Sequence, residues 1–384
     1  MFLTQTIRRN PGLVEAAIRL HGEGLLPDTY LIDMDALLEN ARKIKQCADA
    51  CDVKLYYMLK QLGRNPEIAR RLAALGYEGA VTVDFEEAQS FIRAGIHIGH
   101  VGHLVQVPKS ALEEILAARP DYMTVYSIEK AREADAACGR LGLRQRLLLR
   151  VLDPEDTLYS GQYGGFYLKD LPEALEALRQ LQHVTVAGLT TFPCFLYDEE
   201  LRKIAPTHNL QTIHAAKGML ERAGFTVEQM NMPSATCCQS LPSIAAAGGT
   251  HGEPGHGLSG TTPLHAAADQ EEIPAIVYLS EVSHNLDGKA YCYGGGHYRR
   301  SHVSQALIGG LQSGRIVGVT PPTDESIDYH FGLSGECPVS ESVVMAFRTQ
   351  IFVTRSRVAL VEGISRGEPA ISGIYTAQGQ PIGG

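Results

Sequence analysis

Short apolar runs and longer stretches of helical periodicity alternate along this chain from about residue 53. The apolar runs predict eight strands, at residues 55–59, 80–83, 98–102, 122–125, 146–152, 184–189, 226–230 and 249–253. Between them, Leu171–Leu181 carries one apolar stripe at spacings of three and four, which is typical of an amphipathic helix. Eight β-α units within about 210 residues favour an α/β fold of the (β/α)8 TIM barrel type over an open doubly wound sheet. The glycine run Gly294–Gly296 does not match the dinucleotide-binding pattern of such a sheet.

The sequence pattern changes after Gly260. Residues 273–375 contain strand-like runs and few helical stripes, which predicts a smaller β domain. Its expected strands include Ala275–Leu279, Val343–Phe347, Ile351–Thr354 and Val358–Val361. We therefore expect a barrel at residues 36–261 and a C-terminal β domain at residues 262–384, joined by residues 1–35.

Composition narrows the class of protein. The 384 residues are 44% hydrophobic and carry a net charge of -9, which is typical of a globular chain and argues against a nucleic-acid partner. No apolar stretch approaches the roughly 20 residues of a membrane span, so we expect a cytoplasmic protein with no membrane association. The eight cysteines lack paired short spacings, which favours reduced thiols over disulfides.

Candidate site residues follow three predicted strands, at the end of a barrel where active sites lie. Lys60 comes directly after the first strand, Met232–Thr236 follows the seventh, and Glu253–Gly257 follows the eighth. A lysine in such a place is either a solvated surface charge or an amine with a lowered pKa that can form a Schiff base. Backbone N–H groups near glycines can bind an anion such as a phosphate.

Several segments resemble, in order, the fold-type III pyridoxal-phosphate enzymes, the group of alanine racemase and the diaminopimelate and ornithine decarboxylases. Tyr57–Pro66 is similar to their cofactor-lysine motif, and Glu253–His256 is similar to the decarboxylase Glu-Pro-Gly-Arg motif. Further similarities lie at Glu86–Ile96 and Leu148–Phe166, and with Tyr291–Gly296 and Phe347–Arg355 the whole chain resembles the YhfX-like subfamily.

This resemblance implies pyridoxal 5'-phosphate as cofactor, with Lys60 forming the internal aldimine. It places the phosphate near Ser234, Gly255 and His256, and Arg64 occupies a position from which a racemase tyrosine reaches the phosphate. Racemases carry an arginine where this chain has Glu253; a carboxylate there, as in the decarboxylases, favours a protonated pyridine nitrogen and a stronger electron sink.

The resemblance also suggests roles for other side chains. Arg150 matches an arginine near the cofactor ring oxygen, although a structural ion pair inside the barrel is an equal alternative. A racemase needs a second acid or base, usually a tyrosine from the partner subunit, and Tyr291, Tyr293 and Cys292 are the candidates. The alternative for these three is packing within the β domain.

No metal site is expected. His97, His100 and His103 are spaced by three on a predicted strand, and this spacing sends neighbouring side chains to opposite faces.

The expected activity is therefore on the Cα of an amino acid or amine, as a small-molecule substrate, through an aldimine and a carbanion or quinonoid. Racemisation or epimerisation is the first alternative, decarboxylation or another lyase reaction the second, and a non-catalytic cofactor carrier the third. The decarboxylase Cys-Gly-Pro run is absent, and single-barrel carriers lack a second domain. The resemblance also implies a homodimer. The sequence leaves the substrate open.

Overall fold

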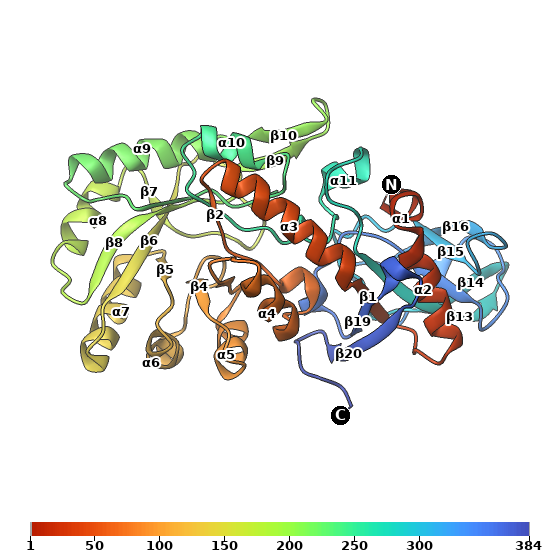
Figure 1. Ribbon diagram of the computed structural model, residues 1–384. Helices are drawn as coiled ribbons and strands as arrows, with labels where there is room; N and C mark the ends of the chain where they lie inside the picture. The colour runs from red at the N-terminus through yellow and green to blue at the C-terminus, as the bar shows by residue number, and fades with distance from the viewer. Residues whose placement is uncertain (1, 384) are drawn as a thin grey trace. The chain divides into compact units, whose positions relative to one another are not determined.

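The computed structural model describes residues 2–383, which form two compact units (Figure 1). The barrel unit comprises residues 45–59 and 66–254. The β unit comprises the chain up to residue 44, residues 60–65 and the chain from residue 255 onward. The chain passes between the units within helix α3 (Met34–Ala50) and again on both sides of residues 60–65 and after residue 254.

Eight parallel strands form the core of the barrel unit, in the order β2-β12-β11-β8-β6-β5-β4-β3. They are β2 (Lys54–Leu55), β3 (Ala80–Val81), β4 (Ile98–Val101), β5 (Tyr122–Val125), β6 (Gln145–Leu152), β8 (Val184–Thr190), β11 (Gln229–Asn231) and β12 (His251–Gly252). A parallel bridge between Tyr57 and Ala80 joins the first strand segment to β3, and this bridge closes the ring. The predicted (β/α)8 barrel is thereby confirmed.

Helices alternate with these strands and lie outside them (Figure 1). They are α4 (Pro66–Ala74), α5 (Phe85–Arg93), α6 (Leu112–Ala117), α7 (Ile128–Leu141), α8 (Leu171–Leu178), α9 (Asn209–Arg222) and α10 (Leu241–Ala246), with a short turn η2 (Lys109–Ala111). Local signals fix their ends: Asp84 accepts a hydrogen bond from the backbone N–H of Glu87 and caps α5, as its sequence predicts. Strand β7 (Phe166–Tyr167) extends the sheet beside β6, and β9 (Phe195–Asp198) with β10 (Lys203–Pro206) forms a hairpin.

The β unit contains a nine-stranded sheet in the order β14-β17-β16-β15-β18-β13-β1-β19-β20. Its strands are β1 (Thr29–Asp33), β13 (Ile276–Leu286), β14 (Lys289–Tyr293), β15 (Gln305–Ile308), β16 (Arg315–Thr320), β17 (His330–Leu333), β18 (Ser342–Met345), β19 (Arg357–Glu362) and β20 (Ala370–Thr376). Because β14 also pairs with β13, six of these strands form a second closed ring. Early in the chain, β1 pairs antiparallel with β13 and parallel with β19, which makes the N-terminal segment part of this sheet.

Helices α1 (Phe2–Arg9) and α2 (Pro11–Gly22) cover this sheet with apolar side chains such as Leu13 and Val14, which are fully buried. The remaining elements are α11 (Pro263–Ala267) and the short turns η1 (Lys60–Leu62), η3 (Ile351–Val353) and η4 (Ile364–Arg366). No helix in the described part of the chain has both the length and the apolarity needed to cross a membrane.

The strand predicted at Ile351–Thr354 is wrong, because this segment forms the 3-10 turn η3. A strand would place Ile351 and Val353 on the same face. In the structure Ile351 is fully buried, whereas Val353 is 55% exposed. The burial of one apolar residue against the β unit therefore outweighs the local preference for extended backbone.

Candidate active site

Glu253, which directly follows β12, is the centre of a buried polar network in the barrel unit. Its Oε1 accepts hydrogen bonds from Asn231 Nδ2 at 2.6 Å and from His100 Nδ1 at 3.0 Å. A carboxylate only accepts, so His100 carries its hydrogen on Nδ1 and its Nε2 accepts from Thr124 Oγ1 at 2.6 Å. The Glu253 backbone N–H donates to Thr236 Oγ1 at 3.2 Å. Side chains from β4, from β11 and from the segment after β11 thus hold one carboxylate in a fixed position.

The network keeps Glu253 ionised. Burial by itself raises the pKa of a carboxyl group, but His103, His100 and Asn231 outweigh it and lower the pKa of Glu253 to about 2. Its second oxygen, Oε2, is buried and makes no hydrogen bond among the described residues. It lies 3.9 Å from His103 Nε2. The barrel unit therefore holds a buried anion with one oxygen available to a ligand.

The prediction that the three spaced histidines cannot converge is wrong for His100 and His103. Strand β4 ends at Val101, and Gly102 adopts φ +81, which turns the chain so that the two rings lie 5.1 Å apart. A Cβ on Gly102 would lie 2.6 Å from Thr124 O, so this turn requires glycine. The strand rule fails because His103 lies beyond the strand.

His97 is separate from this group, since it is half exposed and pairs with Asp121 at 2.9 Å. The ligand atoms of His100, His103 and Glu253, in contrast, all lie within 4.8 Å of one another. Two imidazoles and a carboxylate can bind a transition-metal ion. The sequence signal for His100, a histidine inside an apolar strand, indicates a buried polar contact but does not identify its partner.

Arg150, on β6, contributes a buried positive charge to the same unit. It is 1% exposed, and it donates from Nη1 to Tyr126 Oη and from Nη2 to Gln162 O, both at 2.7 Å. Tyr126 in turn donates to His103 O at 2.5 Å, which links Arg150 to the Glu253 network. The hydrogen-bond partners of Arg150 among the described residues are therefore a hydroxyl and a backbone carbonyl, both neutral, and not the carboxylate of the structural ion pair considered as its alternative. A buried cation with only neutral partners suits an anionic ligand.

The segment after β11 is conformationally strained at Ser234 and Ala235, which adopt φ values of +112 and +48. The Ser234 hydroxyl donates a hydrogen bond to Phe195 O at 2.6 Å and so binds the first residue of the hairpin strand β9. Binding of a phosphate by Ser234 stays a prediction.

Lys60 begins η1 of the β unit, directly after the barrel segment that ends at Leu59. In the barrel unit, Met58 N donates to Pro254 O at 3.1 Å, so the chain leaves this unit at two neighbouring points. The two segments that continue from these points into the β unit also lie close together. A Cβ atom added to Gly255 would be 2.6 Å from Gln61 Oε1. Two predicted segments distant in sequence thus run side by side within each unit.

Arg64, predicted to contact a phosphate, is buried in the β unit at φ +52. Its Nη1 donates to Gln378 Oε1 at 2.8 Å, and its guanidinium lies 4.7 Å from the centre of the Phe352 ring. The predicted role stays a prediction.

Cys292 requires a correction as a candidate acid or base. It alternates with Tyr291 and Tyr293 on β14, so its side chain lies on the other face of the strand. The thiol is fully buried, and this burial raises its pKa to about 12. Tyr293 is 39% exposed, and the partly exposed Tyr291 ring stacks on His284. The tyrosines therefore remain candidates, whereas the cysteine belongs to the core.

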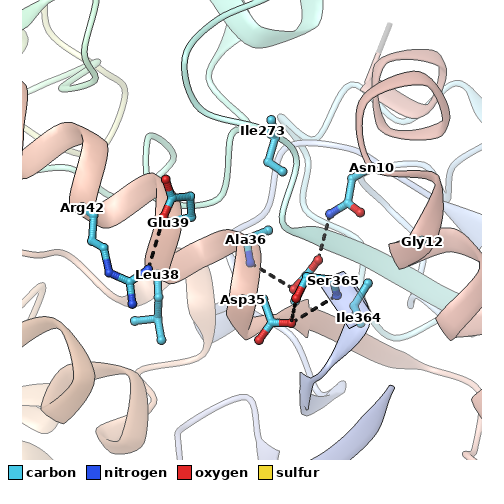
Figure 2. A pocket seen from close by; sticks show the side chains of 11 residues that line it. Asn10, Gly12, Asp35, Ala36, Leu38, Glu39, Arg42, Ile273, Ile364 and Ser365 are labelled. Carbon is cyan, nitrogen blue, oxygen red and sulfur yellow. Dashed lines mark hydrogen bonds and ion pairs between the residues drawn. The ribbon is translucent and has the colours of Figure 1, made fainter. Parts of the chain in front are cut away.

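A separate pocket of about 610 Å³ lies in the β unit beside the start of α3 (Figure 2). Its carboxylates already have partners. Asp33 accepts from Ala36 N at 3.1 Å, which caps α3, and from Asn10 Nδ2 at 2.9 Å. Asp35 accepts from Ser365 Oγ at 2.7 Å. These contacts account for the acidic residues structurally.

Two family models match the chain, one for each predicted region. "Alanine racemase, N-terminal domain" matches residues 32–263, and "YhfX-like, C-terminal domain" matches residues 277–371. The protein YhfX of Escherichia coli (strain K12) is 47% identical over 386 residues, which cover 100% of each chain.

Solved structures with the same fold include a D-threonine aldolase from Filomicrobium marinum, with a TM-score of 0.67 and 17% identity over 92% of this chain and 94% of that one. A D-threo-3-hydroxyaspartate dehydratase from Delftia sp. HT23 has a TM-score of 0.65 and 18% identity, over 89% of this chain and 95% of that one. The alanine racemase of Clostridium difficile 630, in complex with cycloserine, has a TM-score of 0.63 and 16% identity, over 91% of this chain and 98% of that one. The chain therefore belongs to the alanine racemase-like, fold-type III family, in its YhfX-like subfamily.

Proposed function

We propose that this protein is a pyridoxal-phosphate-dependent enzyme acting at the Cα of an amino acid or amine, most simply as a racemase or epimerase. The observation that carries the proposal is the pair of opposite buried charges in the barrel unit. Glu253 offers an anionic oxygen without a hydrogen bond, and Arg150 offers a cation whose described partners are neutral. Each suits a ligand group of the opposite charge.

The cofactor has these groups. Its protonated pyridine nitrogen suits Glu253 Oε2, and its phenolate oxygen suits Arg150. Asn231 and His100 both bond to the other carboxylate oxygen, so Oε2 would be the atom that holds the ring nitrogen, and the negative charge of Glu253 would favour a proton on that nitrogen. The residues present therefore fit a 3-hydroxypyridine ring.

Lys60 supplies the amine that would hold the cofactor aldehyde. When bound, pyridoxal phosphate withdraws electrons from the substrate Cα and so makes its proton acidic. Lys60 Nζ, the amine that the resemblance assigns to the cofactor, would take or return this proton on one face. A tyrosine hydroxyl, from Tyr291 or Tyr293, would move a proton at the same carbon on the other face. We propose that a partner subunit supplies it, so that the working enzyme is a homodimer.

Other reactions at the same carbon are the second choice. The ionised Glu253 also suits decarboxylation, and the structural relatives include proteins named as an aldolase and a dehydratase. A non-catalytic carrier is disfavoured, because the chain devotes a nine-stranded sheet to a second unit. Racemisation requires the fewest groups beyond those already described.

Visible absorption of the purified full-length protein, with and without added pyridoxal phosphate, tests cofactor binding. We expect an absorption band at longer wavelengths than the absorption of the protein itself. Borohydride should bleach this band and attach the cofactor permanently to Lys60, which peptide mass spectrometry would locate. Lys60→Ala should show no fixed adduct, and Lys43→Ala, which removes a partly exposed lysine, should behave like the wild type. A wild-type protein that stays colourless with added cofactor would refute the proposal.

Exchange at the substrate Cα then tests the chemistry, whichever product is formed. Amino acids incubated with the enzyme in D2O should lose the Cα proton signal in NMR spectra, and chiral chromatography should detect the opposite enantiomer. Exchange with carbon dioxide release would favour a decarboxylase instead.

Metal analysis of the same protein tests the alternative use of His100, His103 and Glu253. A stoichiometric transition metal in a colourless protein would assign this cluster to a metal centre.

A further inference from the structure

The buried His256, which the resemblance places near the phosphate, pairs with the partly buried Arg348 in the β unit. Arg348 Nε donates to His256 Nε2 at 3.1 Å, and Gln350 Nε2 lies 3.4 Å from the same nitrogen. His256 Nδ1 lies 3.1 Å from Thr261 Oγ1. Because Nε2 accepts, the hydrogen of the neutral imidazole is on Nδ1 and is donated to Thr261. The imidazole thus has no donor left for an anion.

The charge around His256 is positive. Burial lowers its pKa well below the ordinary value, and the charges of Arg348, Lys60, His265 and Arg300 lower it further. His256 therefore stays neutral and acts as a fixed acceptor for the arginine.

Backbone contacts bring these groups together within the β unit. Arg348 N donates to Ser301 O at 3.0 Å, next to Arg300, and Thr349 Oγ1 donates to Gln61 O at 3.0 Å, next to Lys60. The Arg348 guanidinium therefore lies against one neutral histidine, and the backbone of the residues next to Lys60 and Arg300 is close to the Arg348 segment.

Two buried amide oxygens of the same cluster lack partners among the described residues. Gln61 and Gln350 are 5% and 8% exposed, and the Oε1 atom of each makes no hydrogen bond among the described residues. The oxygen and nitrogen of the Gln61 amide are interchangeable by a flip, so Gln61 can present an N–H group to an anion, whereas Gln350 Nε2 already faces the His256 acceptor. Gly255 leaves space beside Gln61, where a Cβ would lie 2.6 Å from its Oε1. The cluster thus has unused polar groups as well as positive charge.

We propose that Arg348, held in position by His256, binds the phosphate group of the cofactor together with the Gln61 amide. This inference rests on the proposed function, since it assigns residues to the cofactor of the same enzyme. A phosphate dianion suits several cations and donors arranged around it, whereas a single carboxylate is satisfied by one arginine fork. His256 is a positioning residue: it occupies the Nε edge of the guanidinium and so fixes the direction of the Nη groups.

Equilibrium titration of the full-length apoprotein with pyridoxal phosphate and with pyridoxal, followed by absorbance and protein fluorescence, tests this. Arg348→Gln should raise the Kd for pyridoxal phosphate by about tenfold to a hundredfold, as expected for a lost charge-assisted hydrogen bond. The Kd for pyridoxal, which lacks the phosphate, should stay within about twofold of the wild type. Arg366→Gln, which removes an exposed arginine of the β unit, is the matched control and should change neither.

His256 variants test the positioning role. His256→Gln keeps an acceptor for Arg348 and should retain most of the phosphate preference. His256→Phe removes the acceptor and should weaken the binding of pyridoxal phosphate relative to pyridoxal, as Arg348→Gln does. Equal behaviour of both variants would contradict the role of His256.

Inorganic phosphate provides a measurement on the wild type alone. It should compete with pyridoxal phosphate but should not displace pyridoxal. This arm decides the matter if Arg348→Gln does not fold, because failure of phosphate to compete would overturn the inference.

The remaining outcomes separate the inference from the proposed function. Unchanged pyridoxal phosphate affinity in Arg348→Gln, with weakened binding of an acidic amino acid, would overturn the inference and assign Arg348 to the substrate. Equal loss of both cofactor forms would also overturn it, because the defect would then not be specific to phosphate. A wild type that binds neither form would refute the proposed function itself.

Discussion

His100 donates a hydrogen bond from Nδ1 to Glu253 Oε1 over 3.0 Å, and neither side chain has appreciable solvent contact. The two residues are 153 positions apart in the chain. Thr124 fixes the imidazole from its other nitrogen, so the barrel sets both the orientation and the charge of the carboxylate. A rigid, ionised carboxylate is the form that a protonated ring nitrogen requires.

Replacement of this histidine should destabilise the barrel unit. His100→Leu leaves Thr124 without its acceptor and Glu253 without one donor, and each lost buried partner costs about 1–3 kcal/mol. His100→Asn keeps a donor close to the position of Nδ1 and should lose less. Urea unfolding of the two variants measures the difference, and a His100→Leu protein as stable as the wild type would contradict this account.

Loss of the charge on Glu253 should slow chemistry more than it weakens cofactor binding. Glu253→Gln keeps the shape of the side chain but cannot hold a proton on the ring nitrogen by ionic attraction. We expect Cα exchange in D2O to slow by about 10²-fold or more, as for other lost electrostatic contacts at reacting groups. Glu253→Arg should also retain the cofactor, with slower exchange. Wild-type exchange rates in either variant would disprove the electron-withdrawing role.

Acid sensitivity should depend on His251. Its burial, followed by the nearby charge of Lys54, lowers its pKa from 6.5 to about 3. The folded protein therefore binds fewer protons than the unfolded chain between these values, and His251 makes stability fall as the pH drops from 6.5 towards 3. His251→Phe keeps the stacking on Tyr56, which is 5.1 Å away, and should flatten this part of the curve. Unfolding free energies across the range test it, with the exposed His214→Gln as the control.

Glu253 adds to acid sensitivity at lower pH. Its folded pKa is lowered from 4.5 to about 2, so its ionised form stabilises the fold fully above 4.5, and this contribution is lost as the pH falls through 2. In Glu253→Gln, stability should change less with pH between these values. An unchanged pH dependence would show that the carboxylate is not ionised in the native protein.

The residues of β14 should separate by function. Cys292→Ala should leave Cα exchange unchanged and destabilise the β unit by about 1–3 kcal/mol, because it removes a buried side chain. The acting tyrosine, in Tyr291→Phe or Tyr293→Phe, should be required for exchange of only one enantiomer, since Lys60 serves the other face. Exchange of both enantiomers at wild-type rates in the double tyrosine variant would exclude the two-base mechanism.

The barrel could be predicted because its signals are local. Each strand is a short apolar run and each helix has an apolar stripe, so the order of eight β-α units is readable without any distant contact. Asp84 caps its helix as expected, because a cap depends on three neighbouring residues. Ile351 did not follow its local preference, because its burial depends on the rest of the β unit.

The sequence alone also placed Lys60, Arg150 and Glu253 at or near strand ends, since the carboxyl ends of parallel strands meet at one edge. The tertiary structure decided which side chains meet there. The convergence of His100 and His103 depends on the turn at Gly102, and the pairing of Arg348 with His256 depends on two distant segments of the β unit. The alternation of side chains along a strand predicts on which face of the sheet each residue lies. Contacts across a closed sheet, however, form only when distant segments pack together.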